Sequence, residues 1–192
     1  MNVSFTKWVE IDRKTDLYFS SHNNPRLRAV LAALTRLGTG ALWVVVYTLS
    51  LILLPDHCAR VILTLIFAEL IGLMVIVALR YLTKRERPIG LHRACPLTPW
   101  NRYSFPSHHT LRCFIIAVIV GADFPGLLPF LIVTASTVGF SRIYLSKHYL
   151  SDVVVGCLLG ILLALMSQRF IWPLISSARP TLMSCDGRYG WW

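Results

Sequence analysis

The chain has 192 residues, of which 55% are hydrophobic and 15% charged, and its net charge is +10. A soluble domain usually carries about a quarter charged residues, so this composition excludes an ordinary soluble protein. The positive charge by itself would suit nucleic acid or anionic lipid. Nucleic acid is not expected as a partner, because the basic residues lie between apolar segments and no separate soluble domain carries them.

The first thirty residues contain many charged side chains, which leave no uninterrupted apolar run for a signal peptide. Several large apolar residues lie among those charges: Phe5, Trp8, Val9, Ile11 and Leu17. This mixture predicts an interfacial leader helix within residues 1–30, lying on the membrane surface. A solvated leader helix is the alternative that the composition leaves open.

Four long apolar blocks follow the leader, at residues 37–54, 61–79, 124–140 and 153–168. A helix crosses a bilayer with about 20 apolar residues, in a range of roughly 17 to 25. A fifth stretch, residues 113–122, reaches this length only if the same helix begins near residue 107. The fold class is therefore predicted to be all-α: a polytopic membrane helix bundle of about five transmembrane helices plus the N-terminal interfacial helix.

The bundle is predicted to be a single domain of residues 1–175, followed by an irregular tail of residues 176–192. Its one long loop lies between the second and third spans, where several prolines break regular structure. Loops of this length in a compact domain are usually functional or disordered. In the last span, Gly156 and Gly160 form a small-xxx-small pair, which allows close packing on a neighbouring helix.

The basic residues are distributed unevenly between the two membrane faces. Alternating spans place the leader, the long loop and the 141–148 loop on one face, together with every Lys and Arg except Arg60, Arg169, Arg179 and Arg188. The positive-inside rule would put this face in the cytoplasm. Several of these charges also belong to the candidate site described next, so function as well as topology contributes to the imbalance.

Three groups of polar residues gather at the span ends of this basic face. The first follows the second span and consists of Arg80, Lys84, Arg85, Arg87 and Pro88. Alone, it would be interpreted as an ordinary basic membrane flank. The second is Phe105-Pro106-Ser107-His108-His109-Thr110, in which Ser107 alone would be interpreted as a helix N-cap.

The third group is Ser141-Arg142, followed by His148 and Asp152. His148 and Asp152 are four residues apart, so on a helix they share one face and can form a hydrogen bond. Arginine side chains match phosphate oxygens, and a helix that begins near Ser107 directs backbone N–H groups at an anion. One histidine supported by a carboxylate can attack phosphorus, and a second can protonate the leaving group. Together the three groups predict a phosphate-transfer site.

These residues resemble the three motifs of the type 2 phosphatidic acid phosphatase (PAP2) superfamily: Lys-x6-Arg-Pro, Pro-Ser-Gly-His and Ser-Arg-x5-His-x3-Asp. The first appears here with Arg80 in the lysine position, ahead of Arg87-Pro88. The second appears as Pro106-Ser107-His108-His109, with His108 in the glycine position. The third matches at every specified position from Ser141 to Asp152. The motifs cover residues 80–152, and the pattern of spans extends the resemblance over most of the chain.

The resemblance implies a role for each matching residue. His148 would attack phosphorus, Asp152 would orient and support it, and His109 would be the general acid. The phosphate oxygens would be held by Arg80, Arg87, Ser107, His108 and Arg142. Lys84 and Arg85 are possible auxiliary residues, with Lys84 able to replace Arg80. The family needs no metal, and no cofactor is expected.

Small bacterial undecaprenyl pyrophosphate phosphatases resemble the chain further, with a Ser-Phe-Pro-Ser-x-His-Thr stretch, a short length and an interfacial leader. This implies a membrane lipid phosphatase that converts undecaprenyl pyrophosphate to undecaprenyl phosphate through a phosphohistidine. Phosphatidylglycerophosphate, phosphatidic acid and lipid A phosphate are the alternative substrates. The resemblance also implies the bacterial inner membrane, with the active site facing the periplasm or exterior, against the raw count of positive charges.

Other classes of function fit parts of the pattern. A zinc site could use His108, His109, His148 and Asp152, but three arginines would crowd a cation. A transporter would suit Glu69 within the second span, although Glu69 can equally be a structural partner of a polar group. The titratable residues gather at span ends rather than through the bilayer, which favours the phosphatase. The intact His148 and Asp152 disfavour an inactive lipid-binding relative, and the spans disfavour a soluble vanadate haloperoxidase.

Overall fold

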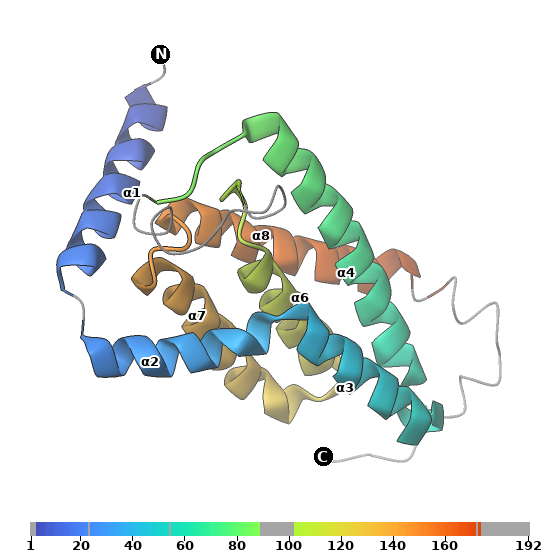
Figure 1. The fold of residues 1–192 in the computed structure, drawn as a ribbon. Helices are drawn as coiled ribbons and strands as arrows, with labels where there is room; N and C mark the ends of the chain where they lie inside the picture. The colour runs from blue at the N-terminus through green and yellow to red at the C-terminus, as the bar shows by residue number, and fades with distance from the viewer. Residues whose placement is uncertain (1–2, 23, 54, 89–101, 172, 174–192) are drawn as a thin grey trace.

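The computed structural model describes residues 3–22, 24–53, 55–88, 102–171 and 173. The helices of this part of the chain are α1 (Val3–Ser21), α2 (Pro25–Leu34), η1 (Thr35–Gly38), α3 (Gly40–Leu53), α4 (Pro55–Thr83), α6 (His108–Asp123), η3 (Pro125–Leu127), α7 (Leu128–Tyr144), α8 (Leu150–Met166) and η4 (Ser167–Ile171). An isolated bridge between Glu86 and Tyr103 is the one β-type pairing among the described residues. The predicted all-α membrane bundle is therefore confirmed (Figure 1).

Three helical segments are long and apolar enough to cross a membrane, namely Ala59–Thr83, Pro125–Tyr144 and Leu150–Phe170. A fourth span is possible if Pro25–Gly38 and Gly40–Leu53, which meet at a bend of 49°, count as one broken span. The predicted helix over 107–122 forms as α6 but has only 16 residues. At 1.5 Å per residue it is about 24 Å long, short of the roughly 30 Å hydrocarbon core.

Helix α6 lies at the centre of the bundle, between α4, α7 and α8 (Figure 1). Its isoleucine and leucine side chains are buried around most of its circumference, including Leu111, Ile115 and Ile119. A helix that is apolar all round is stable only when surrounded by other helices. Its ends are set by Ser107, whose extended backbone precedes it, and by Pro125, which prevents its continuation.

Close packing between α6 and α8 depends on the two glycines of α8. A Cβ atom on Gly156 would lie 2.7 Å from the carbonyl oxygen of Ser107, and one on Gly160 would lie 2.5 Å from that of Leu111. The predicted close packing of the small-xxx-small pair is confirmed, and its partner is α6. Because Gly156 touches Ser107, the same contact holds the beginning of α6 against α8.

The predicted leader consists of two helices rather than one. Asn24 separates them, and its side chain caps α2 by accepting hydrogen bonds from the N–H groups of Arg26 and Leu27. Helix α1 leaves Trp8, Val9, Leu17 and other apolar side chains exposed, as expected of a helix on a membrane surface. On its other face, Phe19 packs against Phe140 and Tyr144 of α7.

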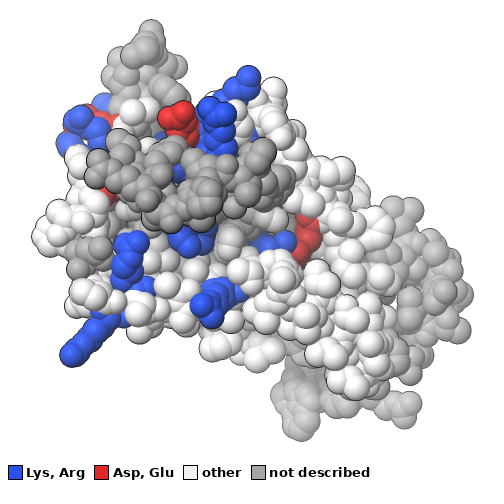
Figure 2. All heavy atoms as spheres, viewed as in Figure 1, with Lys and Arg blue, Asp and Glu red and all other residues white. Residues whose placement is uncertain are grey.

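The C-terminal end of α4, the beginnings of α6 and α8 and the end of α7 lie at one end of the bundle (Figure 1). Figure 2 shows Lys and Arg atoms gathered on this part of the visible face, whereas the opposite part is mostly uncharged. The predicted tail, residues 176–192, and most of the predicted long loop lie outside the described residues.

Candidate active site

The three sequence groups meet at this end of the bundle. The backbone N–H of Ser107, at the start of α6, donates a 3.0 Å hydrogen bond to the backbone oxygen of Asp152, in the first turn of α8. Arg80 in the last turn of α4, Arg87 beyond it and Arg142 in the last turn of α7 are all about 95% buried, with 5%, 5% and 6% of their surface exposed. Residues up to 72 positions apart therefore form one buried polar cluster.

His148 lies in the short loop that joins α7 to α8 and is 2% exposed. The loop is closed by the carbonyl oxygen of Arg142, which accepts hydrogen bonds from the N–H groups of Lys147 and His148 at 3.0 and 3.1 Å. Ser146 has a positive φ of 49°, which turns the chain sharply. The Ser-Arg-x5-His spacing is thus the length of a helix end plus one tight turn.

The two ring nitrogens of His148 face groups of opposite charge. Nε2 lies 3.3 Å from Nη1 of Arg87, and Nδ1 lies 3.6 Å from Oδ2 of Asp152. Arginine can only donate and carboxylate only accepts, so the geometry favours a proton on Nδ1 and a lone pair on Nε2. The Nδ1 atom has no hydrogen-bond partner at this distance, and such catalytic bonds often tighten only when substrate binds.

The charges around His148 also favour its neutral form. Burial lowers the pKa of His148 well below its usual value, and the positive charges of Arg142, Arg87 and Arg80 lower the pKa further. An imidazole with a low pKa is unprotonated at neutral pH. His148 therefore has the protonation state that a nucleophile needs.

Asp152 is completely buried and held on both carboxylate oxygens. Oδ2 accepts a 2.9 Å hydrogen bond from the N–H of Tyr149, and Oδ1 accepts a 2.8 Å bond from Nη1 of Arg85. Its place in the first turn of α8 also puts it at the positive end of the helix dipole. These contacts keep Asp152 fixed next to the His148 ring.

Arg142 has donors available for an anion. Its Nη1 donates to the hydroxyl of Thr35 at 3.1 Å, and its Nε, although buried, has no hydrogen-bond partner. Among the described residues, no carboxylate forms an ion pair with Arg142. A buried guanidinium with unsatisfied N–H groups is stabilised by an oxyanion that accepts hydrogen bonds from them.

Ser107 occupies the N-cap position of α6, but its side chain makes no capping hydrogen bond. Its hydroxyl instead accepts a 3.0 Å hydrogen bond from Thr110. The first N–H groups of α6 are thus not satisfied by the Ser107 side chain. A helix start of this kind is a favourable place for a phosphate.

The two neighbouring histidines of α6 face different surroundings. Nε2 of His108 lies 3.4 Å from Nη2 of Arg112. His109 packs against Gly38, where a Cβ atom would lie 2.8 Å from its ring, and burial together with the positive charge of Arg142 lowers its pKa. Both histidines therefore lie near Arg112, while His109 also lies near Arg142 and His108 near Arg80.

Arg112 is also the ion-pair partner of Glu69, the carboxylate within the second predicted span. Oε2 of Glu69 accepts a 2.8 Å bond from Nε of Arg112, and Oε1 accepts a 2.7 Å bond from the hydroxyl of Tyr47. Arg112 further donates to the backbone oxygen of Gly38. Glu69 therefore joins α3, α4 and α6 as a structural partner, which removes the main support for a transporter.

The two auxiliary candidates also separate in space. Lys84 follows the last residue of α4 and is exposed, and its backbone is in the left-handed region, with a φ of 47°. Arg85 contacts two carboxylates, those of Asp12 and Asp152. Arg80, not Lys84, thus lies in the buried cluster. Zinc would require converging ligands, and within the described residues no three His, Cys, Asp or Glu side chains do so.

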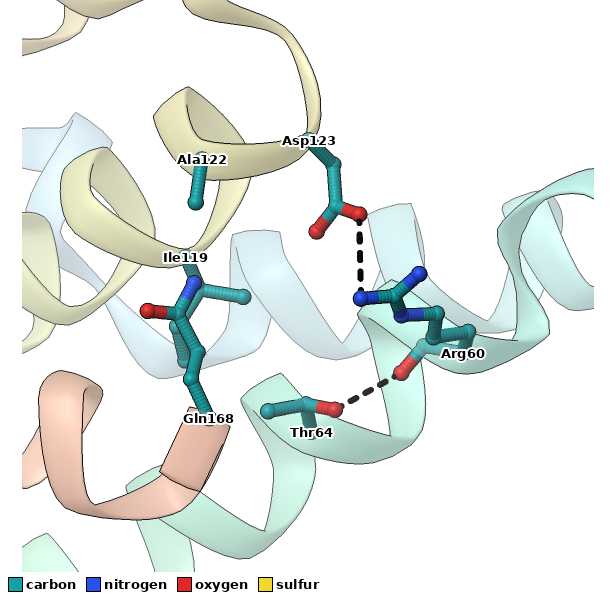
Figure 3. Close-up of a pocket in the computed structure, with 6 residues that line it drawn as sticks. All are labelled: Arg60, Thr64, Ile119, Ala122, Asp123 and Gln168. Atoms are coloured by element: carbon teal, nitrogen blue, oxygen red, sulfur yellow. Dashed lines mark hydrogen bonds and ion pairs between the residues drawn. The ribbon is translucent and has the colours of Figure 1, made fainter. Parts of the chain in front are cut away.

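A separate hollow of about 190 Å³ lies at the opposite end of the bundle, between α4, α6 and η4 (Figure 3). Arg60 and Asp123 face each other across it with an N–O distance of 3.7 Å, and Thr64 and Gln168 add polar atoms. None of the motif residues lines it. It is therefore distinct from the candidate active site.

Asp12 lies beside the candidate site, although no sequence pattern predicted it there. This residue of α1 is 3% exposed and contacts both Arg85 and Ser151, next to Asp152. One signal could have found it, because Asp12 and Phe19 are seven residues apart and so share a face of α1. A carboxylate on the face of a leader helix that docks onto the bundle indicates a buried partner.

The chain has the sequence features of a known protein family. Residues 60–176, more than half of the chain, match the PAP2 superfamily. The chain belongs to the PAP2 superfamily. All three motifs lie within the matched residues, so the predicted family is confirmed.

Several PAP2 relatives are similar over part or most of the chain. Phosphatidylglycerophosphatase B of Bacillus subtilis is 33% identical over 86 residues, which are 39% of this chain and 42% of that protein. Decaprenylphosphoryl-5-phosphoribose phosphatase of Mycobacterium tuberculosis is 29% identical, over 72% of this chain and 77% of the relative. Undecaprenyl-diphosphatase of Sulfolobus acidocaldarius is 28% identical, over 74% and 70%. The first match spans less than half of the relative's length.

Two solved structures share the fold. Aquifex aeolicus LpxE superposes with a TM-score of 0.68 at 24% identity, covering 84% of this chain and 94% of that one. A transmembrane PAP2-type phosphatidylglycerolphosphate phosphatase from Bacillus subtilis gives 0.66 at 22% identity, covering 91% and 89%. With the apolar helices, this similarity shows that the PAP2 protein described here is an integral membrane protein.

Proposed function

We propose that this PAP2 protein is a metal-independent lipid phosphatase that converts undecaprenyl pyrophosphate to undecaprenyl phosphate through a phosphohistidine at His148. The observation that carries the proposal is the His148 ring, buried between Arg87 and Asp152. In this position the unprotonated Nε2 faces Arg87, one of the arginines that would bind a phosphate, and the Nδ1 proton faces a carboxylate. This is the arrangement that a histidine nucleophile requires.

In the first step, the terminal phosphate binds with its oxygens toward Arg80, Arg87 and Arg142 and toward the start of α6. Nε2 of His148 attacks phosphorus, and the bond from phosphorus to the bridging oxygen breaks. Burial lowers the pKa of His109 in the empty site, so in this scheme the negative charge of the bound pyrophosphate raises that pKa, and the protonated ring then gives its proton to the departing oxygen. Asp152 stabilises the positive charge that the His148 ring acquires, as carboxylates do in other histidine-dependent sites.

In the second step, water attacks the phosphorus of the phosphohistidine, and the P–N bond breaks. The neutral His109 accepts the proton from water, which restores its starting state. Orthophosphate leaves, and His148 again holds a lone pair on Nε2. The arginines stabilise the oxygens of both transition states, where preorganised donors have their largest effect.

The choice of a polyprenyl substrate rests on the relatives that match most of the chain. Two of them, each matched over at least 70% of both chains, are named for decaprenyl- or undecaprenyl-linked phosphates. Among the sequence relatives, the one named for phosphatidylglycerophosphate matches over a shorter segment, and the solved phosphatidylglycerolphosphate phosphatase, at 22% identity, shares the fold alone. Phosphatidylglycerophosphate, phosphatidic acid and lipid A phosphate are the alternative substrates.

We place the protein in the bacterial inner membrane, with the active site facing the periplasm or exterior. The arginines and histidines of the site account for much of the positive charge on this face, so its excess does not require a cytoplasmic orientation. The exposed apolar side chains of α1 would rest on the same surface of the membrane.

The test measures phosphate release by the purified protein in detergent with excess EDTA. Undecaprenyl pyrophosphate, phosphatidylglycerophosphate and phosphatidic acid are compared in parallel, for the wild type and for His148→Ala. His22→Ala is the matched control, because His22 is exposed on the leader. A phosphorylated peptide containing His148, trapped by alkaline quench, would identify the intermediate.

The proposal expects EDTA-resistant release, fastest from undecaprenyl pyrophosphate, that His148→Ala abolishes and His22→Ala retains. Activity that is lost with EDTA and restored by zinc would reject metal independence. Normal turnover by a folded His148→Ala variant would reject the phosphohistidine. Faster release from another lipid would replace the proposed substrate.

A further inference from the structure

The leader helix α1 reaches the candidate active site through one side chain. Asp12 is 3% exposed, whereas its neighbours Ile11 and Trp8 are 43% and 48% exposed. Farther along α1, Phe19 packs its ring against Phe140 and Tyr144 of α7. Asp12 is thus the buried carboxylate of a helix that is otherwise largely on the surface.

Asp12 uses both carboxylate oxygens on groups next to Asp152. Oδ1 accepts a 2.9 Å bond from the backbone N–H of Ser151, and Oδ2 accepts 2.6 Å bonds from the Ser151 hydroxyl and from Nη2 of Arg85. Ser151 is the second residue of α8, so its N–H has no partner within that helix. Asp12 supplies this partner from α1.

Arg85 connects the two carboxylates. Nη2 binds Asp12 at 2.6 Å, while Nη1 binds Asp152 at 2.8 Å and Ser151 at 2.6 Å. Its guanidinium also lies over the ring of Tyr149, 4.3 Å from the ring centre. A guanidinium whose two terminal nitrogens each bind a carboxylate has a fixed orientation. Arg85 therefore serves Asp152 instead of the phosphate.

We infer that Asp12 is a positioning residue, which fixes Asp152 against His148 through Arg85 and Ser151 and so makes docking of the leader helix a condition for full catalysis. The inference rests on the proposed function for its chemistry. The chain of contacts runs from α1 through the segment after α4 to the first turn of α8. Without Asp12, Arg85 keeps one carboxylate and loses the anchor that sets its angle, so Asp152 moves relative to Nδ1 of His148.

Asp12→Asn is the most informative variant, because the amide oxygen can still accept the N–H of Ser151 while the charge facing Arg85 is lost. Glu10→Gln is the matched control, since Glu10 lies on the same helix in an exposed pair with Lys14. Arg85→Lys keeps a positive charge but removes the fork that binds two carboxylates. All are compared in the full-length protein in detergent.

Two measurements are made on each variant. The first is the kcat and KM of phosphate release from whichever of the three lipids the wild type hydrolyses. The second is calorimetric binding of orthovanadate, an analogue of the phosphoryl-transfer transition state that depends on His148 but not on the lipid. Calorimetry separates a weaker Kd, which indicates displaced groups, from a lower stoichiometry, which indicates unfolded protein.

We expect Asp12→Asn and Arg85→Lys to lower kcat by about tenfold or more and to weaken vanadate binding similarly, with KM and stoichiometry unchanged. Glu10→Gln should match the wild type. Wild-type kcat and vanadate Kd in Asp12→Asn would overturn the inference, as would a loss confined to stoichiometry. A rise in KM alone for Arg85→Lys would also overturn it, because this would indicate direct phosphate binding.

The outcome separates this inference from the proposed function. If the wild type binds vanadate but hydrolyses none of the lipids, the proposed substrates are rejected, while a vanadate Kd that depends on Asp12 still supports the inference. If the wild type hydrolyses a lipid with no effect of Asp12→Asn, the inference fails and the proposed function stands. Absence of both vanadate binding and lipid hydrolysis in the wild type would reject both.

Discussion

Gly156→Ala tests the contact that brings two of the motifs together. The added Cβ would lie 2.7 Å from the backbone oxygen of Ser107, whereas ordinary contacts begin at 3.4 Å, so α6 and α8 must separate by about 0.7 Å. The obstacle is backbone and cannot rotate away. Overpacking of this kind costs about 1–3 kcal/mol, and we expect a lower Tm in detergent.

The same displacement should reduce activity. Ser107 donates its N–H to the backbone oxygen of Asp152, so the start of α6 moves relative to Asp152. A misplacement of about 1 Å can cost on the order of 100-fold in rate, and 0.7 Å here should lower kcat at least about tenfold. Phosphate release per folded molecule measures this effect.

Two further glycines serve as controls. Gly126→Ala adds a Cβ with no atom within 4 Å, so stability and activity should remain as in the wild type. Gly160→Ala meets Leu111 at 2.5 Å, one helical turn farther from the site, and should lower Tm with a smaller loss of kcat. If Gly156→Ala behaves like Gly126→Ala in both assays, the proposed role of close packing is refuted.

Four further predictions address the charges of the site and its support. The acid limb of kcat/KM that reports His148 should lie below pH 6.5, because its lowered pKa keeps the ring neutral into the acid range; a pH-rate profile with this limb at or above 6.5 would contradict the assigned environment. Arg142→Lys should lower kcat/KM about 10- to 100-fold, since lysine keeps the charge but loses the fork and its bond to Thr35; undiminished phosphate release would show that charge alone suffices. Glu69→Ala should destabilise the fold by about 3 kcal/mol because it leaves Arg112 buried without its carboxylate, and Tyr47→Phe by about 1 kcal/mol; equal thermal stability of Glu69→Ala and wild type would exclude the structural role.

The sequence by itself determined the class of structure and the residues that form the candidate site. Apolar blocks of span length can be satisfied in a bilayer only as helices, so the all-α bundle followed from composition and length. The spacing of Ser141, Arg142, His148 and Asp152 encodes a helix end, a tight turn and a helix start. Such local features depend on neighbours within about ten residues, which the sequence displays directly.

Tertiary structure decided which polar groups became partners. Arg85 stands among the basic residues after the second span, yet it binds Asp12, 73 positions earlier, and Asp152, 67 positions later. His108 shares a motif with His109, yet its ring lies 3.4 Å from the guanidinium of Arg112, which in turn binds Glu69 of α4. No local pattern specifies such pairs, because they depend on how closely the helices approach and on which face each one buries. The glycines of α8 and the docking of α1 set those distances, and so they decide which carboxylate, arginine and histidine meet.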